Sequence, residues 1–164
     1  MRQLSLSWKI PILAVAVIAA VFHYYWAGFG SPEPRTLRGL HLAMLLPFVF
    51  FLYPATSKSP QHRPSVPDLL LAVLCLAASL YTVVCADRLN QRFIGFHAVQ
   101  PIEVVLGGLL ALAVMEACRR SVSKWFAATV VVVIVYLMTC QYWPGMFHYK
   151  PFSLDRAIEI LYLP

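Results

Sequence analysis

The sequence predicts an all-α integral membrane protein with about five transmembrane helices and a short C-terminal amphipathic helix at the membrane interface. Three observations support this fold class. The 164 residues are 60% hydrophobic and only 12% charged, whereas roughly 25% of the residues in soluble domains are charged. The apolar residues form five blocks, each close to the ~20 residues that cross a bilayer as a helix. Aromatic residues gather at the block ends, where their rings favour the headgroup level.

The five expected spans cover about 10–29, 37–53, 66–86, 101–118 and 125–143. The first span follows a basic N-terminus and so imitates a signal peptide, but its apolar run continues into His23 and Trp26 without a small-residue cleavage pattern. We therefore expect it to remain as an uncleaved span. No connection between the blocks is long enough to form another domain, so residues 1–164 are expected to form one transmembrane domain.

Two further elements can be placed from local patterns. The third span opens with Ser65 and Asp68 at the spacing of a capping box, with Pro67 in the first helical turn. In the segment 153–163, one side of a helix would carry Leu154, Ala157, Ile158 and Leu161, and the other side Asp155, Arg156 and Glu159. This amphipathic pattern predicts a short helix, at about 153–163, that lies on the membrane surface.

The basic residues indicate contact with a lipid bilayer rather than with nucleic acid. The net charge is +6, but Lys and Arg occur singly or in pairs between apolar blocks instead of forming one patch. They are divided almost evenly between the two sides of the five spans. The tightest cluster, Arg119, Arg120 and Lys124, favours a cytoplasmic N-terminus, and an odd number of spans then places the C-terminus in the periplasm.

The fourth span contains two carboxylates, and a charged residue at the centre of a membrane helix costs about 2.5–3.5 kcal/mol. Glu103 lies in its first turn, where the helix dipole favours a negative charge; an ion-binding role is the alternative. Its side of the helix also carries Gly107, Ala111, Val114 and Cys118. Gly107 and Ala111 have the spacing of small residues that lets membrane helices approach closely. We expect this side to be a helix contact.

Two other clusters are candidate subunit contacts. Glu116 precedes Arg119 and Arg120 by three and four residues, which favours ion pairs within one helix; a contact with a partner subunit is the sharper alternative. Arg38 and His41 lie one turn apart at the start of the second span, and an interface hydrogen bond is expected there rather than a proton relay. The subunit-interface candidates are Arg38, His41, Glu103, Gly107, Ala111, Glu116, Arg119 and Arg120.

Nothing in the sequence indicates catalysis, so we expect no catalytic residue, no substrate-binding residue, no metal site and no cofactor. The five histidines have no metal-binding spacing, and no nucleotide or hydrolase motif is present. One enzymatic alternative is a membrane thiol oxidoreductase of the disulfide-forming type, because the chain has four cysteines. Cys75 and Cys85 on one helix would be about 15 Å apart, too far for a disulfide, and inert packing is expected for all four.

Several motifs resemble one family in the same order. These are Arg38 to Ala43 leading to Leu52-Tyr53-Pro54-Ala55, then Met115 to Ser121, then Pro144 to His148, and finally Phe152 to Arg156 with Leu161-Tyr162-Leu163. Over about residues 38–163 they resemble the N-terminal part of fused permeases of TRAP transporters that work with TAXI-type binding proteins. Unlike those fused proteins, this chain stops at Pro164, which implies a separate small permease subunit or a fragment of a longer chain.

The resemblance implies a sodium-coupled secondary transporter for organic anions such as dicarboxylates in a bacterial inner membrane. A large permease subunit would hold the substrate and sodium sites and move as an elevator, and a periplasmic TAXI-type protein would deliver the solute. The small subunit would brace the stationary scaffold. The residues agree with bracing, because the sequence gives no indication of intramembrane ion pairs, broken midspan helices or an inverted repeat, which a self-sufficient carrier needs.

Overall fold

A computed structural model of the chain describes residues 2–30, 32–93, 96–150 and 153–163. Phe152, which belongs to the last of the motifs above, and Pro164 lie outside the described residues, as does the side chain of Leu154. Every regular element among the described residues is a helix. Five helices are long and apolar enough to cross a membrane, and a short helix follows near the C-terminus. The expected fold class of an all-α membrane protein is therefore confirmed.

The observed helices begin and end within a few residues of the expected ones. The long helices are α1 (Leu6–Phe29), α2 (Pro34–Leu52), α3 (Val66–Val84), α5 (Pro101–Ser121) and α6 (Lys124–Thr139). The short elements are α4 (Ala86–Asn90), the 3-10 turns η1 (Cys140–Tyr142) and η2 (Gly145–Phe147), and α7 (Leu154–Leu161). The turn η1 continues α6 directly, so the fifth membrane-spanning segment is Lys124–Tyr142.

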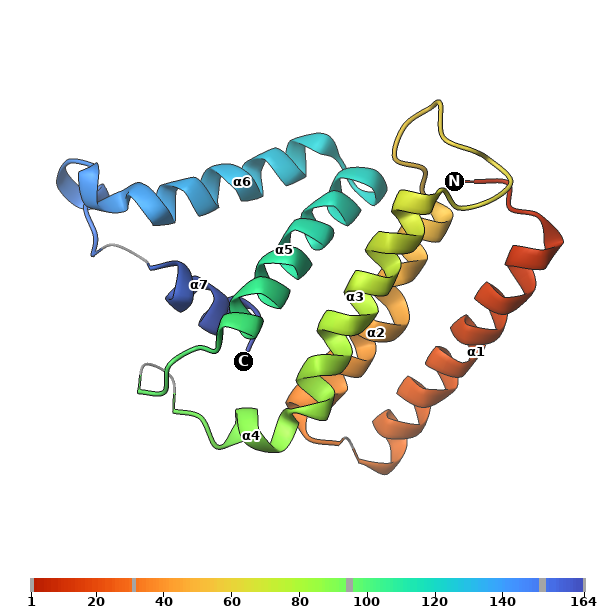
Figure 1. Cartoon of the computed structure of the whole chain (residues 1–164), viewed down its shortest axis with the longest axis horizontal. Helices are drawn as coiled ribbons and strands as arrows, with labels where there is room; N and C mark the ends of the chain where they lie inside the picture. Colours follow the sequence, from red (N-terminus) through yellow and green to blue (C-terminus); the bar gives the residue numbers. More distant parts are fainter. Residues whose placement is uncertain (1, 31, 94–95, 151–152, 164) are drawn as a thin grey trace. The chain divides into compact units, whose positions relative to one another are not determined.

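The chain divides into two compact units, Met1–Asn90 and Gln91–Pro164. The single transmembrane domain expected from the sequence stays a prediction. In the first unit, α2 and α3 lie side by side along most of their length (Figure 1). Small residues allow this approach: a Cβ atom added at Gly39 would lie 2.6 Å from Val83 Cγ2 and 2.7 Å from Thr82 Oγ1. The buried residues of this pair include Ala43, Phe50, Ala72, Cys75 and Ala78.

The helix α1 completes the first unit with much less burial. Ala19 is its buried residue, and large apolar side chains such as Leu13, Ile18 and Val21 are exposed. A water-soluble protein rarely exposes so large an apolar surface. The exposed side chains of α1 are instead suited to lipid or to another membrane helix.

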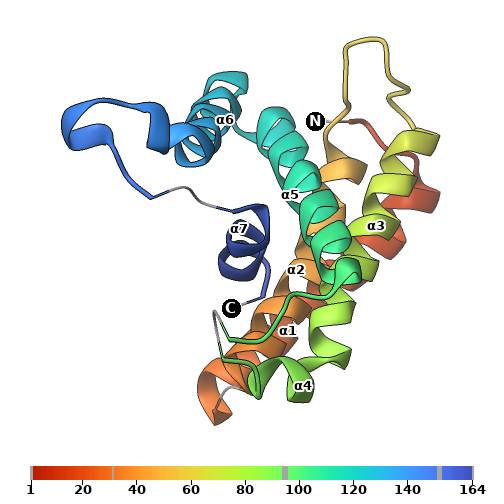
Figure 2. The same ribbon diagram turned by 60° about the vertical axis from the view of Figure 1, so that its left-hand side comes forward.

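In the second unit, α5 and α6 are joined by the short turn at Val122 and Ser123, and they diverge from it (Figures 1 and 2). The Ser123 hydroxyl accepts a hydrogen bond from the backbone N–H of Trp125, which caps the start of α6. The short helix α7 packs beside the first part of α5. This unit therefore consists of a helical hairpin with α7 against one of its arms.

Candidate functional site

The five spanning helices contain three carboxylates, Asp68, Glu103 and Glu116, and each is paired with at least one arginine of the same chain. The spacing of Glu116, Arg119 and Arg120 predicted their ion pairs. The expectation that the spanning segments otherwise contain no ion pairs was wrong for Asp68 and Glu103. Asp68 and Glu103 lie in the first turns of their helices, and Arg119 and Arg120, the partners of Glu116, lie in the last turn of α5. Pairing there offsets the cost of an isolated charge in a membrane helix, so these residues are the candidate site of the chain.

Arg2 and Asp68 form a buried ion pair in the first unit, and both side chains are 0% exposed. The Arg2 guanidinium also donates a hydrogen bond of 2.9 Å to the carbonyl of Phe50. Asp68 accepts hydrogen bonds from the backbone N–H and the hydroxyl of Ser65, at 2.9 and 2.6 Å, which confirms the predicted capping box. The pair thus ties the N-terminal segment to the end of α2 and the start of α3.

Arg92 connects two carboxylates in the second unit. Its Nη1 lies 3.1 Å from Glu103 Oε2, and its Nη2 lies 3.6 Å from Glu159 Oε1 on α7. Glu103 is fully buried and also accepts a 2.8 Å hydrogen bond from the backbone N–H of Gln100. Glu159, which the sequence placed on the polar side of the C-terminal helix, is buried as well, because Arg92 provides its counter-charge. Arg92 therefore holds α7 against the start of α5.

Gly107, one turn beyond Glu103, is the position at which α7 packs closely against α5. A Cβ atom added there would lie 2.9 Å from Ile158 Cγ2 and 2.9 Å from Tyr162 Cδ1. The expected helix contact at Glu103 and Gly107 thus exists, and its partner is α7. The contact does not continue through Ala111, Val114 and Cys118, which are half-buried. The buried residues of α5 are Glu103, Gly107, Leu110, Ala113 and Ala117.

Glu116 forms both ion pairs that its spacing predicts. Arg119 Nε lies 2.7 Å from Glu116 Oε2, and Arg120 Nε lies 2.7 Å from Glu116 Oε1. The Arg120 side chain is only 3% exposed, whereas that of Arg119 is 43% exposed. One carboxylate therefore serves two guanidinium groups at the end of α5, and the cluster keeps a positive charge.

Arg38 and His41 are both exposed on α2. His41 Nδ1 lies 2.8 Å from Nε2 of His23 on α1, and Nδ1 of His23 lies 2.6 Å from the carbonyl oxygen of Ala19. In a neutral pair, His23 Nδ1–H donates to Ala19, and His23 Nε2 accepts from His41 Nδ1–H. The predicted interface hydrogen bond therefore joins two helices of this chain. Within the described ranges, no three potential metal ligands come together.

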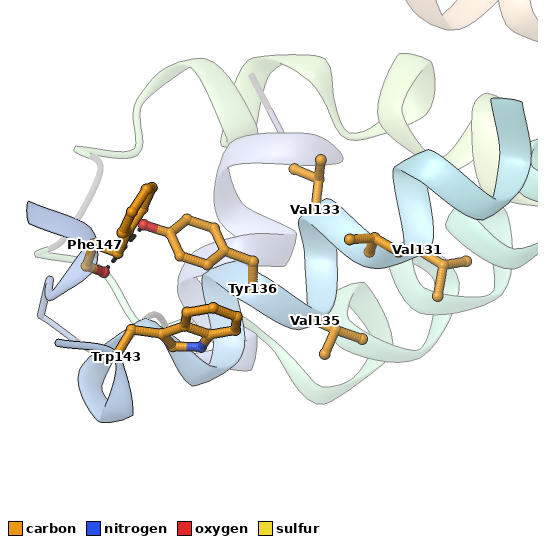
Figure 3. Close-up of a pocket in the computed structure, with 7 residues that line it drawn as sticks. Val131, Val133, Val135, Tyr136, Trp143 and Phe147 are labelled. Atoms are coloured by element: carbon orange, nitrogen blue, oxygen red, sulfur yellow. Dashed lines mark hydrogen bonds between the residues drawn. The ribbon is translucent and has the colours of Figure 1, made fainter.

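Two apolar pockets flank α6. One has a cavity of about 540 Å³ and is lined by valines 131, 132, 133 and 135 together with Tyr136, Trp143 and Phe147. Figure 3 shows the Tyr136 hydroxyl directed at the Phe147 carbonyl, which accepts its hydrogen bond at 3.1 Å. The other pocket lies between α5, α6 and α7, also with a cavity of about 540 Å³, and Ala111 is among its lining residues. These linings suit hydrocarbon or apolar side chains.

The most informative contacts of the chain were not visible in the sequence. Arg2 and Asp68 are 66 residues apart, and His23 and His41 are 18 residues apart. The sequence shows Arg2 and Arg92 only as basic residues near apolar blocks, which does not indicate their ion-pair partners. No protein-family model, curated protein or solved structure matches this chain.

Proposed function

We propose that this chain is the small membrane subunit of a sodium-coupled, binding-protein-dependent secondary transporter of the TRAP class, TAXI type. The transported solutes would be organic anions such as dicarboxylates. A large permease subunit would hold the substrate and sodium sites, and a periplasmic TAXI-type protein would deliver the solute. This chain would brace the scaffold against which the large subunit moves. The motifs that resemble fused TRAP permeases support the proposal.

The main structural support for the proposal is that the carboxylates of the spanning helices are paired within the chain. Asp68, Glu103 and Glu116 are the acidic residues of the spanning helices, and each is neutralised by an arginine of the same chain. A carrier that couples transport to an ion needs polar groups that face a cavity near the membrane midplane. Here Asp68 and Glu103 instead tie the starts of α3 and α5 to other segments of the chain, and Glu116 pairs within its own helix. This use of charge favours a bracing subunit over a self-sufficient carrier.

The exposed apolar surface gives the proposed subunit the area that a bracing role needs. In α1 and α6 most large apolar side chains are exposed, and none of the described residues of α6 is buried. Membrane helices associate through close packing rather than through expulsion of water. We expect α1 or α6 to contact the large subunit and the remainder to face lipid. The proposed location is a bacterial inner membrane, with the N-terminus in the cytoplasm and the C-terminus in the periplasm.

Reconstituted transport tests the proposal. The chain is reconstituted into liposomes alone, or with a large TRAP permease subunit encoded beside it and the matching TAXI-type protein. Uptake of a radiolabelled dicarboxylate is measured under an inward sodium gradient. We expect uptake only when all three proteins are present. Sodium-driven uptake by this chain alone, or full uptake without it, contradicts the proposal.

Two groups of variants separate bracing from other roles. Gly107→Leu displaces α7, and Arg119→Glu reverses a charge at the end of α5; each is expected to reduce co-purification with the large subunit. Lys58→Glu makes the same kind of charge change in an exposed loop and serves as the control. Replacement of all four cysteines by serine or alanine is expected to leave uptake unchanged. Loss of function in the cysteine-free variant would instead favour the thiol oxidoreductase alternative.

A further inference from the structure

An apolar groove runs between α5 and α6 in the second unit. Its cavity of about 540 Å³ is lined on α5 by Gly108, Ala111 and Leu112, on α6 by Val131 and Val135, and by α7. Gly108 leaves open space: a Cβ atom added there would meet nothing within 4 Å. Leu112, Val131 and Val135 are exposed, so in a membrane the groove opens toward hydrocarbon.

A smaller cavity of about 350 Å³ extends the groove toward the turn between the two helices. It shares Leu112, Met115 and Val131 with the larger cavity, and its lining adds Glu116, Arg119 and Lys124. The two cavities therefore form one continuous groove. That groove is apolar over most of its length and charged at one end only.

The charged end is positive. Arg119 and Arg120 share the single negative charge of Glu116, and Lys124 adds another cation beside them. Lys124 is also the first residue of α6. The partial positive charge of that helix start is opposed by the partial negative charge at the end of α5, so the side chains decide the sign. Trp125 follows and is 74% exposed, as is typical of tryptophan at the headgroup level of a bilayer. An anionic group is attracted to this end of the groove.

The length of the groove fits a lipid chain. From Arg119 back to Val104, α5 rises by about 22 Å over 15 residues, whereas the hydrocarbon core of a bilayer is about 30 Å thick. One leaflet takes up half of that core, about 15 Å, so the groove is long enough to hold an acyl chain over the full depth of a leaflet. We infer that it binds an anionic phospholipid, with an acyl chain along Gly108 and Ala111 and the phosphate beside Arg119 and Lys124.

Charge distribution favours a lipid over a partner helix, because a phospholipid is charged at one end and apolar elsewhere, as the groove is. The pocket on the other side of α6 provides a comparison. Its lining residues are uncharged and include Tyr136, Trp143 and Phe147 (Figure 3). That pocket has no means of selecting a headgroup by charge. The inference does not depend on the proposed transport function.

Native mass spectrometry of the purified full chain tests the inference. The protein in detergent is titrated with phosphatidylglycerol, which is anionic, or with phosphatidylcholine, which has no net charge. We expect one phosphatidylglycerol to bind in preference to phosphatidylcholine. Lys124→Gln should weaken phosphatidylglycerol binding about fivefold and leave phosphatidylcholine binding unchanged. Gly108→Leu should abolish the bound lipid of either kind, because the leucine side chain enters the groove.

Two matched variants control for general effects. Gly28→Leu adds the same side chain to a glycine of α1 with open space around it, and Lys58→Gln removes a charge from an exposed loop. Both should bind lipid as the wild type does. Equal binding of the two lipids, retained binding in Gly108→Leu, or equal losses in Gly28→Leu would overturn the inference. A dimer that Gly108→Leu converts to a monomer, with lipid binding unchanged, would overturn it in favour of a second copy of the chain.

Discussion

The pair α2 and α3 and the hairpin of α5 and α6 are both made of consecutive antiparallel helices, yet they pack differently. In the first pair, Gly39 lies so close to α3 that a Cβ atom would overlap Val83 and Thr82. In the hairpin, Gly108 faces open space, and none of the described residues of α6 is buried. One pair is closed and the other leaves a groove.

The two helix pairs differ in how much of their surface they bury against each other. Membrane helices gain stability from close packing and from satisfied polar groups, and α2 and α3 have both, since Arg2 and Asp68 seal one end of the pair. The α5 and α6 hairpin lacks this density along α6. Its apolar surface is therefore available to lipid or to another subunit.

The largest expected effect comes from breaking the ion pair of the closed helices. Asp68→Asn leaves the buried Arg2 guanidinium without its counter-charge, and removing one partner of a buried pair costs about 3–5 kcal/mol. Thermal unfolding in detergent should show a marked fall in Tm. The double variant Arg2→Met, Asp68→Leu should recover much of the loss, because it leaves no unpaired charge. Equal Tm values for Asp68→Asn and the wild type would contradict the importance of the pair.

The next effect compares two glycines. Gly39→Leu forces a side chain against α3, where the carbonyl oxygen of Ser79 would be only 3.2 Å from the Cβ atom, and such overpacking costs about 3 kcal/mol. Gly108→Leu adds the same atoms to open space and should leave Tm nearly unchanged. If both variants unfold at the same temperature, the packing difference between the two helix pairs is not real.

The sequence predicted the contacts that depend on one helix alone. Ser65 with Asp68, and Glu116 with Arg119 and Arg120, follow from the three- and four-residue spacing of a helical turn. Hydrophobic block length likewise predicted the five long helices. These features need no knowledge of which helices are neighbours.

Contacts between helices could not be predicted in the same way. The partners of Arg2 and Arg92 depend on how separate segments pack, and nothing local distinguishes these arginines from other flanking basic residues. Glu159 shows the same limit, because amphipathic spacing placed it on the polar side of α7, whereas Arg92 allows its burial. Ala111 has the correct spacing from Gly107, but the buried residues of α5 continue through Leu110 instead.

A smaller effect is expected within the second unit. Arg92→Gln removes the cation between Glu103 and Glu159 and should cost about 2 kcal/mol, mostly by releasing α7 rather than by unfolding the spanning helices. Hydrogen exchange of residues 154–161 should increase. Arg156→Gln removes a pair whose arginine side chain is 44% exposed, so it should change the exchange little. Similar exchange in both variants would show that Arg92 does not hold α7.

The smallest effect concerns an exposed contact in the first unit, near the start of α2. A hydrogen bond from Asn90 of α4 holds the pKa of Glu33, just before α2, below its ordinary value. The ionised carboxylate is thus favoured in the folded state, so its stabilisation is present above the unfolded-state pKa and is lost as pH falls through the folded-state pKa.

Asn90→Ala should therefore lower Tm slightly at neutral pH, and its difference from the wild type should vanish in acid. Thr36→Val removes the weaker hydrogen bond to the same carboxylate, of 3.2 Å, and should give a smaller change with the same pH dependence. A Tm difference for Asn90→Ala that persists below the pKa of Glu33 would mean that Asn90 stabilises α4 by another contact. A difference confined to neutral pH would show that the hydrogen bond from Asn90 to the ionised Glu33 carboxylate stabilises the first unit.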